Sequence, residues 1–302
     1  MYDTIIIGAG PAGITAAIYA ARKKMKFAII YKEIGGEVAK TTFIENYPGI
    51  AETDGADLTR RLEEHMKRFP VEIIEDEVIS VEKKGKFFAV KAYEKELETK
   101  TVFVSTGAVP KELKIPGERE FASKGVSWCA VCDAPLFAGK DVAIIGAGNT
   151  GLTAVLSFEE IANKIYLISK YAQPKADPVM VDKAKKMKKL EIIPEGMTQS
   201  INGERFVKSI TVKLKDGTSR DIPVSGVFIS IGYNPNTKCL NGLVALNEYG
   251  QIIVDKNNMT SQPGIFAAGD VTDIPFKQII IAAGEGSNAL LGIYDYLSRL
   301  VH

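Results

Sequence analysis

The pattern Gly-x-Gly-x-x-Gly occurs twice in this chain of 302 residues, each time between two short apolar runs. The copies start 138 positions apart and read Gly8-Ala9-Gly10-Pro11-Ala12-Gly13 and Gly146-Ala147-Gly148-Asn149-Thr150-Gly151. Each copy follows a run typical of a buried parallel strand and leads into a segment with helical spacing. We therefore predict two βαβ units in separate nucleotide-binding domains, with strands at 3–7, 27–31, 141–145 and 164–168 and helices at 14–22 and 149–162.

The glycines of such a loop have different physical tasks. The first allows a tight turn, the second lets a pyrophosphate approach the backbone, and the third lets helix and strand pack closely. The phosphates then lie at a helix N-terminus, where free N–H groups favour anions. Pro11 suits the first helical position, and Glu33 stands after the second strand, where an acidic residue holds the adenosine ribose. A glycine turn without any ligand is the alternative, above all for the second copy.

The remaining segments predict a larger α/β fold. Residues 72–104 alternate apolar and polar side chains around turns, which predicts a small antiparallel meander. Three further apolar runs that lead into a glycine turn predict strands, at 102–107, 228–235 and 264–270. A last helix is predicted at 279–300. We expect two Rossmann-like nucleotide-binding domains of the three-layer ββα type, the first of them discontinuous because the C-terminal segment returns to complete it.

The charge balance excludes some partners. The formal net charge is +1, so neither nucleic acid nor an anionic membrane is expected to bind. No stretch approaches the ~20 apolar residues that a membrane-spanning helix needs, and the first strand leaves no room for a signal peptide. The lysine-rich segment 183–189 is typical of a solvated helix face. We expect a cytoplasmic protein.

Two of the three cysteines, Cys129 and Cys132, form a Cys-x-x-Cys sequence between the two glycine patterns. Cysteines at this spacing can close a small disulfide at the start of a helix, where the pKa of a thiol falls. A zinc site would need further ligands, and the only histidines are His65 and His302. We therefore predict a redox-active pair and no metal, and no chemical role for Cys239.

Asp133 directly follows the second cysteine of the pair. Thiol–disulfide exchange needs an acid that protonates the leaving thiolate, and no histidine stands near the motif. Asp133 is therefore our candidate acid. Aspartate is also a preferred helix N-cap, and the two roles can coexist.

Together these motifs resemble the low-molecular-weight thioredoxin reductases of the bacterial and archaeal type, a family of flavin-dependent pyridine nucleotide-disulfide oxidoreductases. The resemblance runs from end to end. Besides the two glycine patterns and the sequence 129–133, it rests on Gly35-Gly36, Glu45-Asn46-Tyr47-Pro48-Gly49, Thr106-Gly107, Gly232-Tyr233-Asn234-Pro235-Asn236-Thr237 and the run 264–270.

The resemblance implies a division of labour between domains. Residues 1–110 and 239–302 would form an FAD-binding domain, and residues 111–238 an NAD(P)H-binding-like domain that carries the dithiol. Cys132 would face the flavin, and Cys129 would attack the disulfide of thioredoxin or a thioredoxin-like partner. Members of the family are homodimers whose nicotinamide domain rotates, and the segments 110–116 and 236–242 are the hinge candidates.

The resemblance also implies binding residues. The family equivalents of Asn46, Asp270 and Gln278 contact the flavin, and Asp270 binds its ribityl chain. The full expected FAD site is Gly8, Gly10, Pro11, Ala12, Gly13, Tyr31, Glu33, Gly35, Gly36, Glu37, Thr42, Asn46, Val78, Thr106, Gly107, Gly269, Asp270, Lys277, Gln278 and Ile279. The expected second nucleotide site is Gly146, Gly148, Asn149, Thr150, Gly151, Lys170 and Lys175.

The second nucleotide site departs from the family pattern. The family carries His-Arg-Arg-x-x-x-Arg after the second strand, and these cations bind the 2′-phosphate of NADPH; here the segment 169–175 reads Ser-Lys-Tyr-Ala-Gln-Pro-Lys. Lysine lacks the bidentate fork of arginine, and no acidic residue is present to accept the ribose hydroxyl of NADH. The donor therefore stays open between NADPH, NADH and a non-nicotinamide donor such as a deazaflavin or ferredoxin.

Two other functions are compatible with the same motifs. A dithiol oxidase would pass electrons from a small dithiol through FAD to oxygen, and a flavin-binding redox sensor would bind FAD without turnover. The intact set of Cys129, Cys132 and Asp133 favours a thioredoxin-disulfide reductase over both.

Overall fold

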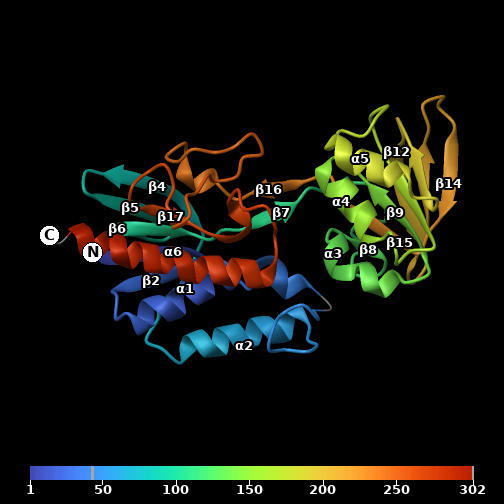
Figure 1. The fold of residues 1–302 in the computed structure, drawn as a ribbon. Helices are drawn as coiled ribbons and strands as arrows, with labels where there is room; N and C mark the ends of the chain where they lie inside the picture. The colour runs from blue at the N-terminus through green and yellow to red at the C-terminus, as the bar shows by residue number, and fades with distance from the viewer. Residues whose placement is uncertain (42–43, 301–302) are drawn as a thin grey trace. The chain divides into compact units, whose positions relative to one another are not determined.

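The computed structural model describes residues 1–41 and 44–300, which form two compact units (Figure 1). Unit 1 consists of Met1–Val109 and Asn234–His302, and unit 2 is Pro110–Tyr233. The chain thus crosses between units after residues 109 and 233, whereas the sequence-based boundaries follow residues 110 and 238. The two crossing segments, β7 (Ala108–Pro110) and β16 (Tyr233–Pro235), pair with each other as a two-stranded sheet.

Unit 1 is built on a seven-stranded mixed sheet of order β3-β2-β1-β6-β5-β4, with β17 also paired to β6. Strands β1, β2, β3, β6 and β17 run parallel, and β4, β5 and β6 form an antiparallel meander. The elements are β1 (Tyr2–Ala9), α1 (Pro11–Arg22), β2 (Phe27–Ile34), η1 (Gly36–Lys40), α2 (Gly55–Lys67), β3 (Glu72–Glu75), β4 (Val78–Lys84), β5 (Phe87–Ala92), β6 (Glu96–Val104), η3 (Lys238–Leu240), β17 (Ile265–Ala267), η4 (Gly269–Val271) and α6 (Ile279–Leu300).

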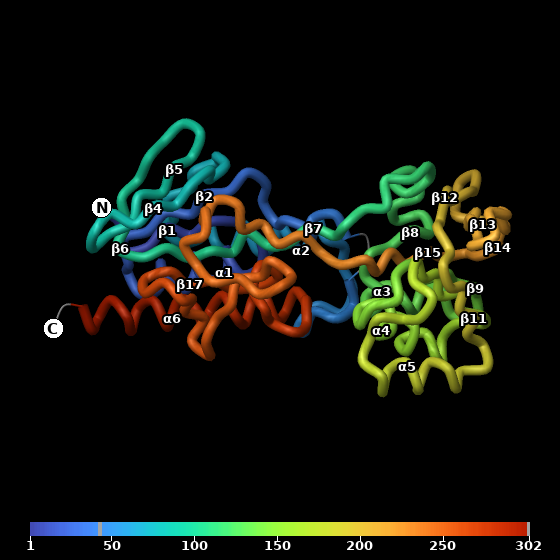
Figure 2. Tube along the Cα trace, turned by 90° about the horizontal axis from the view of Figure 1, so that it is seen from above, coloured from blue at the N-terminus to red at the C-terminus, as the bar shows by residue number. Residues whose placement is uncertain are grey.

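The alternation of side chains along β1 produces the layers of unit 1. Ile6 is fully buried on the face covered by α1 and α6, whereas Ile5 and Ile7 are buried on the face covered by the meander and the segment around Leu240. Helices α1 and α6 lie side by side in both views (Figures 1 and 2). A Cβ on Gly286 of α6 would lie 2.2 Å from the Ala12 carbonyl oxygen, so a glycine permits this close approach.

Unit 2 repeats this architecture with a smaller parallel sheet of order β11-β10-β9-β15-β8. One face is covered by an antiparallel sheet and the other by helices. The elements are β8 (Val126–Ser127), α3 (Ala130–Asp133), η2 (Ala134–Phe137), β9 (Asp141–Ile145), α4 (Asn149–Ser157), β10 (Lys164–Ile168), α5 (Pro178–Lys185), β11 (Leu190–Ile193), β12 (Met197–Gly203), β13 (Val207–Lys213), β14 (Ser219–Pro223) and β15 (Gly226–Ile229). The predicted fold, two Rossmann-like domains of three layers with the first discontinuous, is confirmed.

Two predicted elements differ from the structure. Strand β3 is not part of the meander, because it pairs in parallel with β2, opposing Ile73 to Ile29. Helix α4 ends at Ser157 instead of 162. Beyond α4 the chain turns, and the Ile161 carbonyl and the Asn163 N–H bond to Gly139 and Lys140, so contacts before β9 replace the last helical turn. The last helix, α6, has the predicted bounds.

None of the helices within residues 1–41 and 44–300 combines the length and apolarity needed to cross a bilayer. The lysine-rich segment begins in α5, and Lys183 and Lys185 are exposed, as predicted.

Candidate functional site

The first glycine loop joins β1 to α1 and leaves space only at its second glycine. Gly8 has φ +102°, and a Cβ there would lie 2.4 Å from the Ser105 carbonyl oxygen. A Cβ on Gly13 would lie 1.9 Å from the Gly8 carbonyl oxygen. A Cβ on Gly10 would meet nothing within 4 Å, and no side chain caps α1. The uncapped helix N-terminus beside open space suits a pyrophosphate.

The second glycine loop has the same geometry between β9 and α4. A Cβ on Gly146, at φ +113°, would lie 2.4 Å from the Ser230 carbonyl oxygen, and one on Gly151 would lie 1.8 Å from the Gly146 carbonyl oxygen. A Cβ on Gly148 would have one neighbour, the Lys175 carbonyl oxygen at 3.7 Å, and no side chain caps α4. Both loops can therefore accept a dinucleotide at the same place.

Several residues expected to bind FAD gather beyond the carboxyl ends of the parallel strands in unit 1. The Asn46 amide donates to the Gln278 side chain at 3.1 Å, so two expected flavin contacts far apart in the sequence meet. Gly269, at φ +75°, brings η4 to α1, since a Cβ there would lie 3.4 Å from that of Ala12. Thr106 donates to the Asn236 carbonyl at 2.6 Å, and the Asn236 amide donates back to the Thr106 carbonyl at 2.8 Å.

Asp270 and Lys277 are partly buried in this region and influence each other electrostatically without a direct ion pair between the described residues. Burial raises the pKa of Asp270, and the Lys277 ammonium acts in the opposite direction. Burial lowers the pKa of Lys277, whose ammonium also donates to the Thr272 carbonyl at 2.6 Å. The pair offers an acceptor and a donor to a polar ligand. Ile279, another residue expected to bind FAD, is the first residue of α6.

The other expected FAD residues lie in or just after β2, in the segments after β1 and β6, and at the start of β4. Tyr31 is buried and Glu33 exposed in β2, and the Gly35 N–H donates to the Ala9 carbonyl at 2.8 Å. Gly35 must lack a Cβ because one would lie 2.4 Å from Thr59 Oγ1. The remaining residues are Pro11 at the first position of α1, Gly36 at φ +57°, Glu37, which pairs with Lys40 at 2.7 Å, Val78 at the start of β4, and Gly107 at φ +68°. Thr42 lies outside the described residues.

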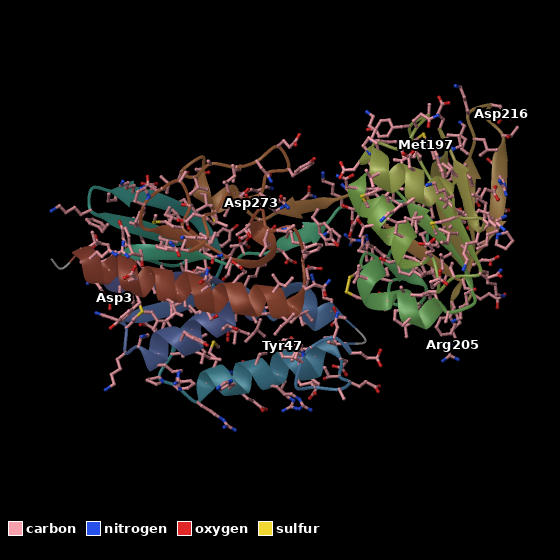
Figure 3. All side chains as sticks on the ribbon, in the orientation of Figure 1. Asp3, Tyr47, Met197, Arg205, Asp216 and Asp273 are labelled. Atoms are coloured by element: carbon pink, nitrogen blue, oxygen red, sulfur yellow. A yellow bond between two sulfur atoms is a disulfide. The ribbon has the colours of Figure 1, made fainter. Side chains whose placement is uncertain are left out.

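Cys129 and Cys132 form a disulfide at the start of the short helix α3, as the sequence predicts (yellow bond in Figure 3). Cys129 is the N-cap of this helix, and its sulfur accepts a hydrogen bond from the Cys132 N–H at 3.3 Å. A hydrogen bond to sulfur stabilises a thiolate after reduction. Within residues 1–41 and 44–300 no cluster of side chains could hold a metal ion. Cys239 is buried, and burial raises the pKa of its thiol to about 11, which disfavours the thiolate form.

Asp133 is the last residue of α3 and is partly buried beside the disulfide. Burial raises the pKa of its carboxyl, and a hydrogen bond with Ser127 acts in the opposite direction. A carboxyl with a raised pKa is suited to donate a proton. Asp133 occupies the N-cap position of the following helix η2, as the alternative interpretation expected, but its side chain makes no capping hydrogen bond there.

Ser127 is a neighbour of the disulfide that the sequence analysis missed. Its Oγ accepts a hydrogen bond from the Cys129 N–H at 3.0 Å and lies 3.4 Å from the Cys129 carbonyl oxygen. A serine two residues before a cysteine carries no signal in the sequence. Only the structure identifies Ser127 as a neighbour of the disulfide.

The segment after β10, which was expected to bind the nucleotide, has a different set of side chains from the segment at the end of β2 in unit 1. The strand registers of the two units match at their start, with Thr4 opposite Phe27 and Val142 opposite Ile165, and Tyr171 is six residues after Ile165, as Glu33 is six residues after Phe27. The ammonium groups of Lys170 and Lys175 lie 5.1 and 3.9 Å from the centre of the Tyr171 ring, within cation–π range. Asn149 accepts from the Asp177 N–H at 2.8 Å, and Thr150 is exposed in the first turn of α4.

Comparison with known proteins agrees with this architecture. The family model described as pyridine nucleotide-disulphide oxidoreductase matches residues 2–292, and the chain belongs to that family. Among solved structures, thioredoxin reductase from Streptococcus pyogenes superimposes with a TM-score of 0.93 at 37% identity, covering 99% of each chain. The enzyme from Giardia duodenalis has a TM-score of 0.93 at 31% identity, covering 98% of this chain and 99% of its own. The resemblance predicted from the sequence is confirmed.

Other relatives carry different names. A ferredoxin-flavin thioredoxin reductase from Clostridium acetobutylicum is 32% identical over 99% of this chain and 98% of its own, with a TM-score of 0.56. An NADH dehydrogenase of Bacillus subtilis and a component of the alkyl hydroperoxide reductase of Pseudomonas putida are both 40% identical over 99% of this chain. The chain spans only 59% and 58% of those two relatives. Membership of the family implies a flavin and a pyridine nucleotide as cofactors.

Proposed function

We propose that this protein is a thioredoxin reductase that transfers electrons from a reduced pyridine nucleotide, through FAD, to the Cys129–Cys132 disulfide and on to thioredoxin or a thioredoxin-like protein. The observation that carries the proposal is the disulfide at the start of α3 beside Asp133, a carboxyl whose pKa burial raises, in the unit that also holds the second glycine loop. The similarity to thioredoxin reductases over 99% of the chain supports it. We also propose a cytoplasmic homodimer.

Each part of the chain has a task in this reaction. FAD would be held in unit 1 by the loop Gly8–Gly13 and by Asn46, Asp270 and Gln278, and the open space at Gly10 supports the fit. Bound there, FAD would supply the means to pass two electrons, received as a hydride from the nucleotide, to the Cys129–Cys132 disulfide. Cys132 would face the flavin, and Cys129 would attack the partner's disulfide. Asp133 would protonate the departing thiolate, since its carboxyl stays protonated to higher pH than an exposed aspartate.

We further propose NADPH as the donor. The position that holds an acidic residue in unit 1 holds Tyr171 in unit 2, so no carboxylate there repels a 2′-phosphate. Lys170 and Lys175 both lie against the Tyr171 ring and bring two positive charges to this position. The nucleotide would bind with its pyrophosphate at Gly148 and its 2′-phosphate at these lysines.

The test is anaerobic stopped-flow absorbance of the FAD-loaded protein with NADPH, NADH or reduced ferredoxin at matched concentrations. We expect NADPH to bleach the flavin fastest and the bleached protein to reduce thioredoxin. Faster bleaching by NADH, or bleaching by ferredoxin alone, would refute NADPH as the donor but would leave the proposed reductase function standing. If only a small dithiol bleaches the flavin and oxygen restores it, the protein is a dithiol oxidase instead.

A substitution separates the dithiol from the flavin steps. Cys129→Ser should abolish thioredoxin reduction, a loss of more than about a thousandfold, because the attacking sulfur is gone. FAD content and flavin bleaching by the donor should remain. Thioredoxin reduction by Cys129→Ser at the wild-type rate would refute the dithiol pathway, and Cys239→Ser is the matched control that should behave like wild type.

A further inference from the structure

The proposed reaction gives no task to the segment 232–237, on which the family resemblance partly rests. Strand β16 lies within this segment, and both of its flanks are held by hydrogen bonds. On one side the Gly232 carbonyl accepts from the Lys111 N–H at 2.9 Å. On the other side the Asn236 amide donates to the Thr106 carbonyl at 2.8 Å. The strand is therefore a firm support for the side chains that leave it.

Tyr233, the first residue of β16, reaches the main chain beside the redox pair. Its side chain is half-buried, and its hydroxyl donates to the Trp128 carbonyl at 3.1 Å, across 105 positions of the sequence. That carbonyl belongs to the peptide that joins Trp128 to Cys129. All three residues lie in unit 2, so the contact forms within one compact unit.

The N–H of the same peptide is also bonded. Cys129 donates it to Ser127 Oγ at 3.0 Å, and Ser127 is buried at the end of β8 (green in Figure 1). The Tyr233 hydroxyl, the peptide and the Ser127 hydroxyl thus form a chain of hydrogen bonds, in which each bond polarises and strengthens the next. The peptide that precedes the expected attacking cysteine is fixed both at its oxygen and at its nitrogen.

The side chain of Trp128 adds no polar contact. Its ring packs against the core of unit 2, but its Nε1 is buried without a hydrogen-bond partner among residues 1–41 and 44–300. The hydrogen bonds that orient the main chain ahead of Cys129 therefore come from Tyr233 and Ser127, and none comes from the indole group. Beyond Cys129 the start of α3 takes over this task, since the Cys132 N–H donates to Cys129 Sγ at 3.3 Å.

We propose that Tyr233 is a positioning residue for the redox pair: its hydroxyl holds the Trp128–Cys129 peptide and so keeps the Cys129 sulfur where it closes on Cys132. A disulfide forms only within a narrow range of geometries, whereas two free thiols tolerate displacement. A fixed peptide therefore favours the disulfide over the dithiol, because less freedom is lost when the ring closes. The inference rests on the function proposed above, in which Cys129 attacks the partner.

The step that Tyr233 serves is the second of two exchanges. The Cys129 thiolate first attacks the partner's disulfide, whose S–S bond breaks; one partner sulfur leaves as a thiolate and takes up a proton, and the other stays bonded to Cys129. The Cys132 thiolate then attacks the Cys129 sulfur, the mixed disulfide breaks, and the second partner sulfur leaves and is protonated. Two electrons and the two thiol protons have then passed to the partner. Only the second attack depends on how the two cysteines of this chain are placed.

The experiment measures the equilibrium between disulfide and dithiol directly. FAD-loaded protein is equilibrated without oxygen in buffers with graded ratios of reduced to oxidised dithiothreitol and is then quenched in acid. The thiols of Cys129 and Cys132 are alkylated and counted by mass spectrometry of the peptides. Tyr233→Phe keeps the ring and removes the hydroxyl, so the equilibrium constant for disulfide closure should fall about threefold to tenfold, the effect of one hydrogen bond.

Tyr2→Phe is the matched control. It removes a hydroxyl that donates to Glu72 at 2.8 Å in unit 1, which does not contain the dithiol, and should leave the closure constant unchanged. A general loss of stability would not move this constant, because both forms are counted in folded protein that retains FAD. Should Tyr233→Phe fail to retain FAD, Ser127→Ala removes the other contact of the same peptide and should lower the constant by a similar factor.

The inference is overturned if the closure constant of Tyr233→Phe equals that of wild type, or if Tyr2→Phe lowers it equally. Reduction of thioredoxin by the wild-type protein is assayed alongside. If wild type reduces no thioredoxin while Tyr233→Phe still lowers the constant, the proposed function is wrong and the role of Tyr233 stands. If wild type reduces thioredoxin and the constant does not change, only the role of Tyr233 is wrong.

Discussion

The two glycine loops have the same backbone geometry but different surroundings. Gly8 and Gly146 adopt φ +102° and +113°, and each faces a serine carbonyl oxygen 2.4 Å from where its Cβ would be. After the second strand, unit 1 has the exposed carboxylate of Glu33, whereas unit 2 has Tyr171 with two lysines against its ring. Steric contact maintains the loops, and we propose that the exposed side chains beyond the second strand of each unit select the nucleotide.

The largest effect is expected when a methyl group is added at the first glycine of either loop, which tests whether the two loops bind separate cofactors. Gly8→Ala and Gly146→Ala should each destabilise their own unit by roughly 2–4 kcal/mol, because both the positive φ and the nearby carbonyl oppose a Cβ. Gly8→Ala should lose FAD on gel filtration, whereas Gly146→Ala should retain FAD and lose flavin bleaching by the nucleotide. Equal loss of FAD in both variants would show that the loops do not serve separate cofactors.

The second glycine of each loop tests ligand contact without disturbing the fold. Gly10→Ala and Gly148→Ala place a Cβ in open space or at 3.7 Å from a carbonyl oxygen, so urea unfolding should change by less than about 0.5 kcal/mol. The methyl group would stand where the pyrophosphate approaches the backbone. We expect affinity to fall about tenfold or more, for FAD in Gly10→Ala and for the nucleotide in Gly148→Ala, measured by equilibrium titration. Unchanged affinity would place the phosphates elsewhere.

The side chains beyond the second strand should control the choice of nucleotide. The double variant Lys170→Gln and Lys175→Gln should lower the NADPH-to-NADH ratio of kcat/KM by about thirtyfold to several hundredfold, since each of the two lost charge contacts to phosphate costs about 1–2 kcal/mol. Binding of 2′,5′-ADP against 5′-AMP, followed by calorimetry, gives the same answer without turnover. Lys186→Gln is the matched control, an exposed lysine of the same unit. A ratio that does not change would exclude these lysines from the nucleotide site.

The smallest expected effect concerns the two partly buried carboxyls. Asp270 has Lys277 opposite it, whereas Asp133 has only a serine hydroxyl against its burial. Because burial raises the pKa of Asp133 above its unfolded value, the folded state favours the protonated form. This preference stabilises the fold below the unfolded pKa and is lost as pH rises through the folded pKa. Asp133→Asn should therefore be more stable than wild type at neutral pH, and the gain should vanish in acid. Urea unfolding at both pH values tests this, and an equal gain in acid would contradict it.

Sequence patterns predicted the elements whose signals are local. The strands beside each glycine loop, the Cys129–Cys132 disulfide and the last helix at Ile279–Leu300 all follow from spacing within a few residues. The two wrong predictions concern elements whose pairing or length depends on residues far away in the sequence. The pairing of β3 with β2 and the early end of α4 depend on hydrogen bonds to other segments, which no local period records.

The sequence by itself determined the two nucleotide loops and the redox pair, because glycines at fixed spacing and cysteines three apart permit few conformations. Only the tertiary structure decided which side chains meet. It joins Asn46 to Gln278 across 232 positions and partly buries Asp133 beside the disulfide. The physical reason is that burial and hydrogen-bond partners are properties of packed surfaces, to which residues distant along the chain contribute equally.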